Sequence, residues 1–226
     1  MLQKAKIYIG FDQRESVVYH TFVQSLLSHA TIPLEITPLS LKSLNTYNES
    51  HKDRSNDFVY SRFLTPYLSD MKGWALYADG DMICQDDIKN LFDLRDESKA
   101  VMVVKHDYKT KQNKKYFNNV NPDYPRKNWS SVILWNCSHP KHKMLTPDFV
   151  QQQTGKFLHR FSWLDDSDIG ELPMEWNWLA IEYAQNKHAK LIHYTLGAPC
   201  LSDYKDTDMS DIWFDSFLKI QEGVEK

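Results

Sequence analysis

The sequence predicts an α/β fold in which a mostly parallel central sheet is flanked by helices. Short apolar runs typical of buried strands alternate along the chain with segments whose apolar residues recur at helical spacing. Polar residues directly follow several of the apolar runs, beginning with Asp12 after 5–11. Strands that alternate with helices form sheets covered on both faces, and such sheets are mostly parallel.

The individual elements follow in chain order. The run 5–11 is expected to be a buried first strand, and 15–28 a helix, because Val18, Phe22 and Leu26 recur at helical spacing. Asp57 is the expected N-cap of a helix over 57–68, which Pro66 should kink or shorten. Further strands are expected at 34–39, 74–78, 100–104, 131–135 and 191–194, loops at 45–56 and 105–128, and a closing amphipathic helix at 211–221.

Length and composition limit the classes of protein to which the chain can belong. A chain of 226 residues, 42% of them hydrophobic and without a long Gly/Ser-rich or Pro-rich spacer, fits one large domain over 1–226. Because 27 Lys and Arg residues stand against 30 Asp and Glu, we expect no nucleic-acid partner. The basic run is either a solvated loop or a segment that holds an anionic molecule; it contains Lys109, Lys111, Lys114 and Lys115.

No segment of the sequence has the pattern of a targeting signal. The apolar run at the N-terminus is too short for a signal peptide or a membrane anchor, and no later stretch approaches the length that spans a bilayer. Cys84, Cys137 and Cys200 are widely spaced and form no CxxC pair, which argues against a disulfide framework and for a reducing compartment. We therefore expect a cytoplasmic protein without a membrane anchor.

Chemically useful side chains gather at the ends of the predicted strands. Asp12, Asp79, Lys105 and His106 all follow apolar runs, and open α/β sheets bind ligands beyond the carboxyl ends of their strands. Asp79 and Asp81 project to the same side of an extended backbone, and Gly80 between them lets a ligand approach closely. Two adjacent carboxylates repel each other unless a cation joins them. The alternative is a pair of solvated residues in an Asp-Gly turn.

A histidine near the end of the last predicted strand supplies a third candidate ligand. Two carboxylates and the neutral imidazole of His193 suit Mn²⁺, with Mg²⁺ as the alternative ion. The alternative for His193 is a histidine that is hydrogen-bonded within the core.

Five motifs occur in order between residue 6 and about residue 200: KIYIGFD, DFVYSRFLTPYL, LYADGDMIC, ELPMEWNWL and HYTLGAP. With them the chain resembles the GT-A (Rossmann-like) glycosyltransferases, and most closely the glycogenin-like group, glycosyltransferase family eight. The resemblance implies a single-domain GT-A fold. It also implies transfer of a hexose, glucose or galactose, from a UDP-sugar donor to an unknown glycan, protein or small-molecule acceptor, with retention of configuration.

The resemblance also implies roles for individual residues. The metal ligands would be Asp79, Asp81 and His193, and the expected nucleotide-sugar-binding residues are Gly10, Phe11, Asp12, Arg62, Asp79, Gly80 and Gly197. The family places an acidic motif near 163–168, which makes Asp165 and, with preference, Asp166 the candidate catalytic carboxylates. The alternative for this pair is an acidic turn that caps a helix.

The chain departs from the family pattern at two places. The family has a lysine shortly after the metal-binding histidine, whereas Ala198 and Pro199 occupy this region here and only Lys205 is nearby. The strand motif that reads the donor sugar occurs in an altered form, at 128–131.

Two other functions remain open at this point. A phosphatase of the haloacid-dehalogenase type also uses an Asp-x-Asp motif, although that motif normally lies on the first strand, which here carries only Asp12. A catalytically degenerate sugar-nucleotide-binding protein would keep the fold but lack the phosphate-contacting lysine.

Overall fold

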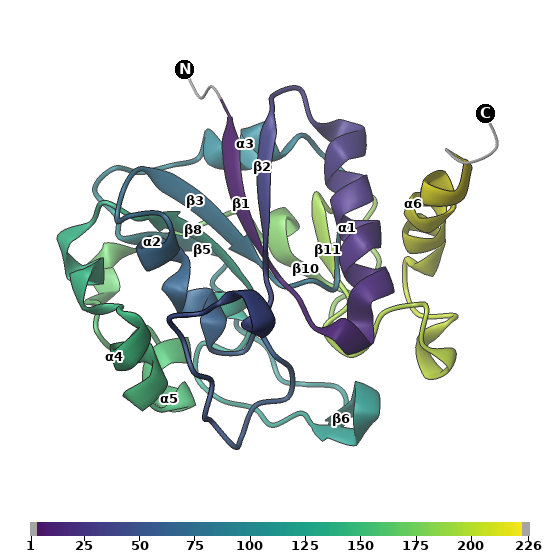
Figure 1. Ribbon diagram of the computed structural model, residues 1–226. Coiled ribbons are helices and arrows are strands. Elements are labelled where there is room, and N and C mark those ends of the chain that lie inside the picture. Colours follow the sequence, from purple (N-terminus) through teal and green to yellow (C-terminus); the bar gives the residue numbers. More distant parts are fainter. Residues whose placement is uncertain (1–3, 223–226) are drawn as a thin grey trace.

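A six-stranded sheet forms the centre of the computed structural model, which describes residues 4–222 (Figure 1). One strand, β8, is antiparallel to both of its neighbours, and the other pairings in the sheet are parallel. This arrangement confirms the predicted α/β fold with a mostly parallel sheet. The strand order is β2 (Leu34–Leu39), β1 (Ala5–Gly10), β3 (Trp74–Ala78), β8 (Val132–Asn136), β5 (Val101–Val103) and β9 (Ile169–Glu171).

Alternation along the central strands divides the core between the two faces of the sheet. On β1, Ile7 and Ile9 belong to one buried cluster and Tyr8 to the other. On β8 the same alternation puts Leu134 on the first face and Trp135 on the second. Because both faces are apolar, the strands read in the sequence as nearly continuous hydrophobic runs.

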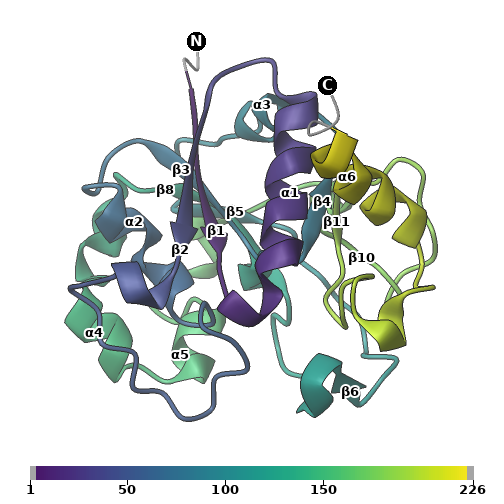
Figure 2. The same cartoon turned by 45° about the vertical axis from the view of Figure 1, so that its right-hand side comes forward.

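Helices cover both faces of the sheet (Figure 2). α1 (Ser16–His29) and α3 (Ile88–Phe92) contribute Phe22, Leu26 and Leu91 to the cluster that contains Ile7. The opposite face is covered by α2 (Thr65–Leu68), α4 (Pro147–Gln152) and α5 (Gly155–His159), with Val150 and Leu158 in the cluster that contains Tyr8.

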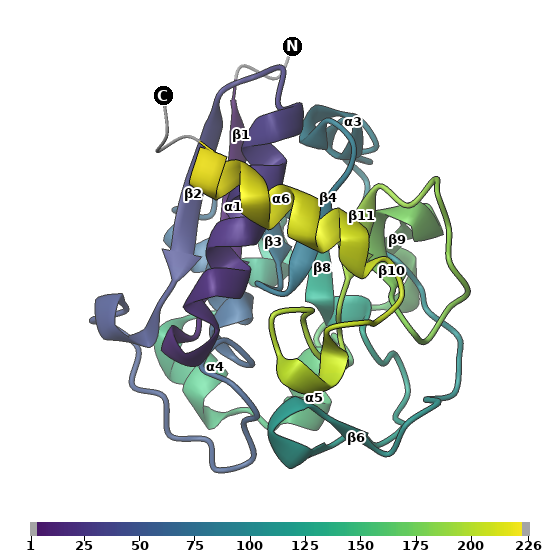
Figure 3. The same cartoon turned by 90° about the vertical axis from the view of Figure 1, so that its right-hand side faces the viewer.

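A second, smaller sheet lies beside α1 and consists of β10 (Trp178–Leu179), β11 (Leu191–His193) and β4 (Met82–Cys84). The last helix, α6 (Ser210–Glu222), lies across α1, as Figure 3 shows. Trp213 of α6 is fully buried and packs with Val18 of α1 and Ile83 of β4. This third apolar cluster holds β4 and β11 against α1.

Three predictions about local structure differ from what the structure shows. The segment expected to form a helix capped by Asp57 instead contains turns and then a 3-10 helix, Ser61–Leu64, whose N-cap is Tyr60. Pro66 lies in the first turn of α2, where a backbone N–H has no partner within the helix. The lack of an N–H in proline therefore costs no hydrogen bond here, and Pro66 begins a helix and does not kink one. The expected long loop 105–128 contains a short antiparallel hairpin, β6 (Lys114–Lys115) and β7 (Asn119–Val120).

The remaining regular structure consists of short 3-10 helices, at Gln13–Glu15, Leu41–Ser43, Tyr116–Asn118, Trp129–Ser131, Pro140–Met144, Asp166–Asp168, Met174–Asn177 and Ser202–Tyr204. Within 4–222 no helix combines the length and the apolar character that crossing a bilayer requires. The first three residues of the N-terminal run considered above as a targeting signal lie outside the described residues. All three cysteines are free thiols.

Candidate metal and nucleotide site

The ends of strands from both sheets meet at one edge of the molecule. Asp12 lies two residues after the end of β1, and Asp79 directly follows β3. Asp81 immediately precedes β4, which pairs antiparallel with β11, so that His193 stands opposite Met82. A backbone hydrogen bond of 2.9 Å from the N–H of Tyr194 to the carbonyl of Asp81 fixes this junction.

Asp79, Asp81 and His193 form a compact cluster whose ligand atoms all lie within 4.8 Å of one another. His193 Nε2 lies 3.2 Å from Asp81 Oδ1 and 4.0 Å from Asp79 Oδ2. The side chains are 13%, 11% and 2% exposed, in sequence order. Burial and the neighbouring Asp81 carboxylate raise the pKa of Asp79, against the opposing influence of Arg62.

The cluster fits a divalent cation. Asp81 Oδ1 is buried, and within residues 4–222 no hydrogen bond reaches it. Buried carboxylate oxygens are normally hydrogen-bonded, so an unbonded one beside a second carboxylate and an imidazole points to a ligand at this position. Two carboxylate oxygens and one imidazole nitrogen form a donor set that suits Mn²⁺.

The imidazole of His193 is oriented by Asn177, a residue that the sequence did not single out. His193 Nδ1 lies 3.1 Å from Asn177 Oδ1. The amide nitrogen of Asn177 donates to Ser131 Oγ at 2.8 Å and to the carbonyl of Asn128 at 3.2 Å, which leaves Oδ1 as the acceptor. His193 therefore carries its proton on Nδ1 and presents the Nε2 lone pair to the two carboxylates. The only signal for Asn177 in the sequence is its place in the motif ELPMEWNWL.

Asp79 is held from the other side by Arg62 and Tyr77. Its Oδ1 accepts a hydrogen bond of 2.6 Å from the Tyr77 hydroxyl and lies 3.0 Å from Arg62 Nη2. Arg62 is fixed in turn by donating from Nη1 to the carbonyl of Ser130 at 2.8 Å. Because Oδ1 is occupied, Oδ2 is the oxygen of Asp79 that faces His193.

The turn after β1 lies directly against the Asp-Gly-Asp segment. A side-chain carbon added to Gly80 would lie 2.5 Å from the carbonyl oxygen of Gly10, so only glycine allows this approach. Gly10, Asp12, Gly80 and Asp81 line one small cavity. The carboxylate of Asp12 already accepts hydrogen bonds from the side chain of Arg14 and from the backbone of Asp57.

The other predicted nucleotide-binding residues lie next to this region. Phe11 makes an edge-to-face contact with Tyr19. Gly197 lies in the loop after His193, where an added side-chain carbon would lie 2.4 Å from the ring of Tyr204. Neither is among the residues that line the cavities at the cluster.

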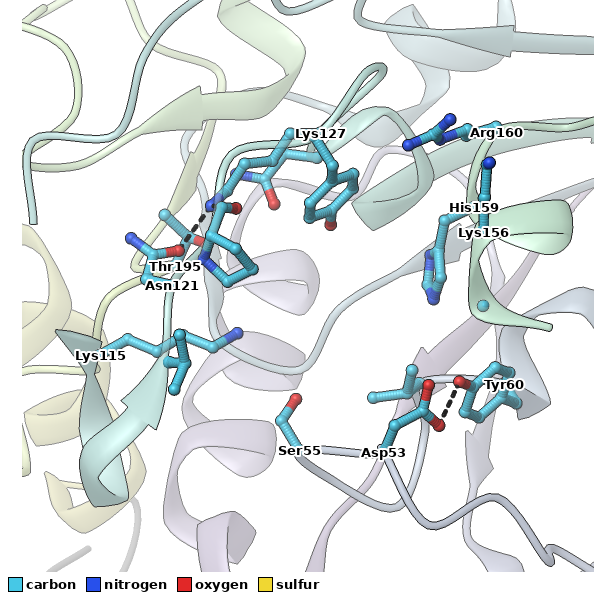
Figure 4. A pocket seen from close by; sticks show the side chains of 16 residues that line it. Asp53, Ser55, Tyr60, Lys115, Asn121, Lys127, Lys156, His159, Arg160 and Thr195 are labelled. Carbon is cyan, nitrogen blue, oxygen red and sulfur yellow. Dashed lines mark hydrogen bonds between the residues drawn. The ribbon is translucent and has the colours of Figure 1, made fainter. Parts of the chain in front are cut away.

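Two adjoining cavities open beside the cluster. The smaller, of about 100 Å³, is lined by Arg62, Asp79, Asp81 and His193 together with Lys115. The larger, of about 400 Å³, shares Lys115 and several other lining residues with it. Figure 4 shows the side chain of Lys115 reaching from the β6–β7 hairpin into the larger cavity. In the sequence, Lys115 stands out only as a member of the basic run.

The structure does not bring the two candidate catalytic carboxylates to these cavities. Asp165 and Asp166 are 79% and 89% exposed and form ion pairs with Lys141 and Arg126 respectively. Asp165 caps the 3-10 helix at 166–168, as the alternative interpretation proposed. Either carboxylate would have to break its ion pair to reach a substrate in the larger cavity, and the catalytic assignment stays a prediction.

Of the other polar residues at strand ends, His106 and Lys105 also lie outside the cavities. His106 bonds to the Tyr183 hydroxyl at 2.7 Å, and the ammonium of Lys105 lies over the ring of Trp129. Lys205 lines a separate cavity with Ser202 and Asp208.

No family model matches the chain. Among curated proteins it is 43% identical over 217 residues to protein CDI of Arabidopsis thaliana, an alignment that covers 92% of this chain and 84% of the relative.

Several solved structures with similar folds are glycosyltransferases. The bifunctional glycosyltransferase WbbM, in its apo form, superposes with a TM-score of 0.67 at 16% identity, over 96% of this chain and 50% of that one. The glycosyltransferase GlyE of Streptococcus pneumoniae TIGR4 superposes at 0.60 and 13% identity, over 95% and 60%. The galactosyltransferase LgtC, in complex with donor and acceptor sugar analogs, superposes at 0.53 and 11% identity, over 95% of each chain.

At these identities the likeness shows the fold, which is that of the GT-A glycosyltransferases. The chain spans half the length of WbbM and about three fifths of GlyE.

Proposed function

The chain belongs to the same family as protein CDI of Arabidopsis thaliana, and we propose that it is a metal-dependent glycosyltransferase that uses a UDP-sugar as donor. The observation that carries the proposal is the cluster of Asp79, Asp81 and His193 at the strand edge of a GT-A fold. The donor sugar is glucose or galactose, and transfer retains the anomeric configuration, as in the glycogenin-like group. The catalytic unit is a single domain over 1–226 that works in the cytoplasm.

Each member of the cluster has a distinct part in holding the cation. Asp79 Oδ2, Asp81 Oδ1 and His193 Nε2 face one another and are the ligand atoms. When bound, Mn²⁺ or Mg²⁺ supplies the positive charge that lets a nucleoside diphosphate leave without being protonated. Arg62 and Tyr77 hold Asp79, and Asn177 holds His193, so the ligands are oriented before the cation binds.

Different residues around the cluster have different roles in binding the donor. The turn that contains Gly10, Phe11 and Asp12 lies beside the Asp-Gly-Asp segment and holds the nucleoside. Gly80 lets the Asp-Gly-Asp segment lie against this turn, and Gly197 lets the loop after His193 pack against the ring of Tyr204. Arg62 neutralises Asp79 and so limits repulsion between the carboxylates and the phosphates.

Lys115 contacts the diphosphate in place of the lysine that the glycogenin-like family carries after the histidine motif. Its hairpin is bound to the HYTLGAP loop by a hydrogen bond of 2.8 Å from the N–H of Tyr116 to the carbonyl of Leu196. Burial lowers the pKa of the Lys115 ammonium, whereas Asp81 and Asp79 raise it. Within residues 4–222 Lys115 forms no ion pair, so its charge is free to meet the diphosphate.

The test of the proposal is donor cleavage without an acceptor. UDP-glucose or UDP-galactose with Mn²⁺ should release UDP and free sugar, because water slowly replaces the acceptor hydroxyl. In ¹⁸O-labelled water the label should appear in the sugar. A phosphatase would instead place the label in inorganic phosphate and form no UDP.

The matched variants are Asp81→Asn, which removes a ligand, and Asp93→Asn, which alters an exposed carboxylate paired with Lys89 on α3. The rate of donor cleavage should fall at least about 100-fold in Asp81→Asn, because the cation loses a ligand. Asp93→Asn should keep the wild-type rate. Full activity of Asp81→Asn would contradict the assigned site.

A further inference from the structure

The larger cavity beside the cluster is strongly basic. Four cationic side chains line it, Lys115, Lys127, Lys156 and Arg160, against the single carboxylate of Asp53. In Figure 4, Lys115 and Lys127 lie on one side of the cavity and Lys156 and Arg160 on the other. The net charge of the whole chain is −3, so this concentration of positive charge is local and does not reflect the composition.

These cations lack acidic partners. Within the described part of the chain none of the four takes part in an ion pair. Lys127 donates only to neutral oxygens, Asn121 Oδ1 at 2.6 Å and the carbonyl of Pro122 at 2.7 Å. Asp53, the one carboxylate of the lining, accepts a hydrogen bond of 2.6 Å from the Tyr60 hydroxyl.

The charges in the cavity repel one another. Burial and the neighbouring Lys115 lower the pKa of Lys127 to about 8. Burial, Arg62 and Lys115 hold the pKa of His159 well below its usual range, so its imidazole is neutral at pH 7. Uncompensated like charges around a cavity are unfavourable unless an anion binds between them.

Three of the four cations line only the larger cavity. Lys127, Lys156 and Arg160 are absent from the lining of the smaller cavity, which holds Asp79, Asp81 and His193. Lys115, Asn128 and Thr195 line both, so the two spaces adjoin. A molecule in the larger cavity can therefore present a hydroxyl group toward the metal cluster while an anionic group meets Lys156 and Arg160.

We propose that the larger cavity binds the acceptor, and that this acceptor carries an anionic group, a phosphate or a carboxylate, which is recognised by Lys156 and Arg160 outside the smaller cavity that holds the metal cluster. The inference rests on the proposed function, since it assigns the second substrate of the same reaction. Lys127, fixed by Asn121 and Pro122, adds positive charge along the side of the cavity. Arg160 provides the planar fork that binds phosphate or carboxylate in two places.

The test uses protein saturated with UDP and Mn²⁺, so that the diphosphate subsite is already filled. Three pairs of probes are titrated by calorimetry: glycerol and glycerol 3-phosphate, glucose and glucose 6-phosphate, and glucose and glucuronate. We expect at least one anionic probe to bind ten or more times more tightly than its neutral partner, since a charged hydrogen bond contributes about that factor. The preference should weaken as salt is raised.

The variants separate the anion-binding residues from general charge. The double variant Lys156→Ala with Arg160→Ala should lose the preference for the anionic probe. Lys143→Ala, which removes an exposed lysine outside the cavity, should keep it. Circular dichroism of each variant checks that the fold is intact, and Lys156→Arg should retain the preference.

Two results would overturn the inference. One is equal binding of the neutral and anionic members of every pair. The other is a preference that survives in the double variant, which would place the anion near Lys115 and the diphosphate. Failure of UDP and Mn²⁺ to bind would count against the proposed function instead, and would be visible in the first titration before any probe is added.

Discussion

At the scale of single residues, the chemistry of the site depends on how neighbours fix three ligands. The sequence predicted that Asp79 and Asp81 lie together, because residues i and i+2 of an extended chain share a side. It could not predict that Tyr77 and Arg62 would occupy one oxygen of Asp79, or that Asn177 would fix His193, since these contacts join distant segments. Residue types were therefore predictable here and their partners were not.

Asn177→Ala tests this orientation. The variant removes the acceptor of His193 Nδ1 and leaves Ser131 Oγ without its donor, so His193 Nε2 is no longer held toward the carboxylates. We expect Mn²⁺ affinity, measured by calorimetry in the presence of UDP, to fall about 10- to 100-fold.

The control for this change is Asn90→Ala. Asn90 is an exposed amide on α3 that donates to Asp86 Oδ1 at 3.0 Å and does not line the cavities at the cluster. Its loss should leave Mn²⁺ affinity unchanged. If both variants bind Mn²⁺ like the wild type, the imidazole is held by other contacts and the part given to Asn177 is wrong.

At the scale of elements, the β6–β7 hairpin is a feature that the sequence did not predict. Strands of two residues are too short to show periodicity, and this hairpin lies within a polar segment that was predicted as a loop. Its position is set by a tertiary contact, the hydrogen bond from Tyr116 to the carbonyl of Leu196. The hairpin also places two adjacent lysines in different environments, with Lys114 exposed and Lys115 facing the cavities.

That difference gives a matched pair of variants. Lys115→Ala should weaken UDP binding in the presence of Mn²⁺ by about tenfold, since it removes one charge-assisted hydrogen bond to the diphosphate. Uridine binding should be unaffected, because the nucleoside carries no phosphate. Lys114→Ala, one residue away on the same strand, should bind UDP like the wild type, and Lys115→Arg should recover part of the affinity.

Either of two outcomes would contradict the role of Lys115. Equal losses for Lys114→Ala and Lys115→Ala would indicate that only the general charge of the hairpin matters. A parallel loss of uridine affinity would indicate that the substitution disturbs the hairpin as a whole.

At the scale of the whole molecule, the α/β class and the long central strands were predictable, because their apolar runs are continuous and end at polar residues. The reversal of β8 within the sheet was not, since strand direction depends on connections that leave no local pattern. The second sheet was missed for a related reason: β4 and β10 are three and two residues long. These short strands nevertheless connect the metal cluster to α1 and α6, so part of the site rests on elements without a sequence signal.

The stability of the whole fold should depend on pH through a buried histidine that takes no part in the metal cluster. His142 is fully buried, with Nε2 3.0 Å from the carbonyl of Ala100, and Nδ1 lies 3.5 Å from Trp163 Nε1, which can only donate. Neutral His142 with its proton on Nε2 satisfies both contacts, whereas protonation would set two N–H groups against each other. Burial accordingly lowers the pKa of His142 from 6.5 to about 4.

The sign of the effect follows from proton counting. Between pH 6.5 and pH 4 the unfolded chain holds a proton on this histidine that the folded chain does not, so stability rises with pH in this window and is lost as pH falls through it. The contribution of His142 to the loss is at most about 3 kcal/mol.

His142→Gln keeps a donor for the carbonyl of Ala100 but cannot take up a proton. Urea unfolding at pH 7 and pH 4.5 should therefore show a smaller drop in unfolding free energy for His142→Gln than for the wild type. His188→Gln, which changes an exposed histidine, should show the wild-type drop. An equal drop in all three proteins would mean that other groups govern the acid sensitivity of the fold.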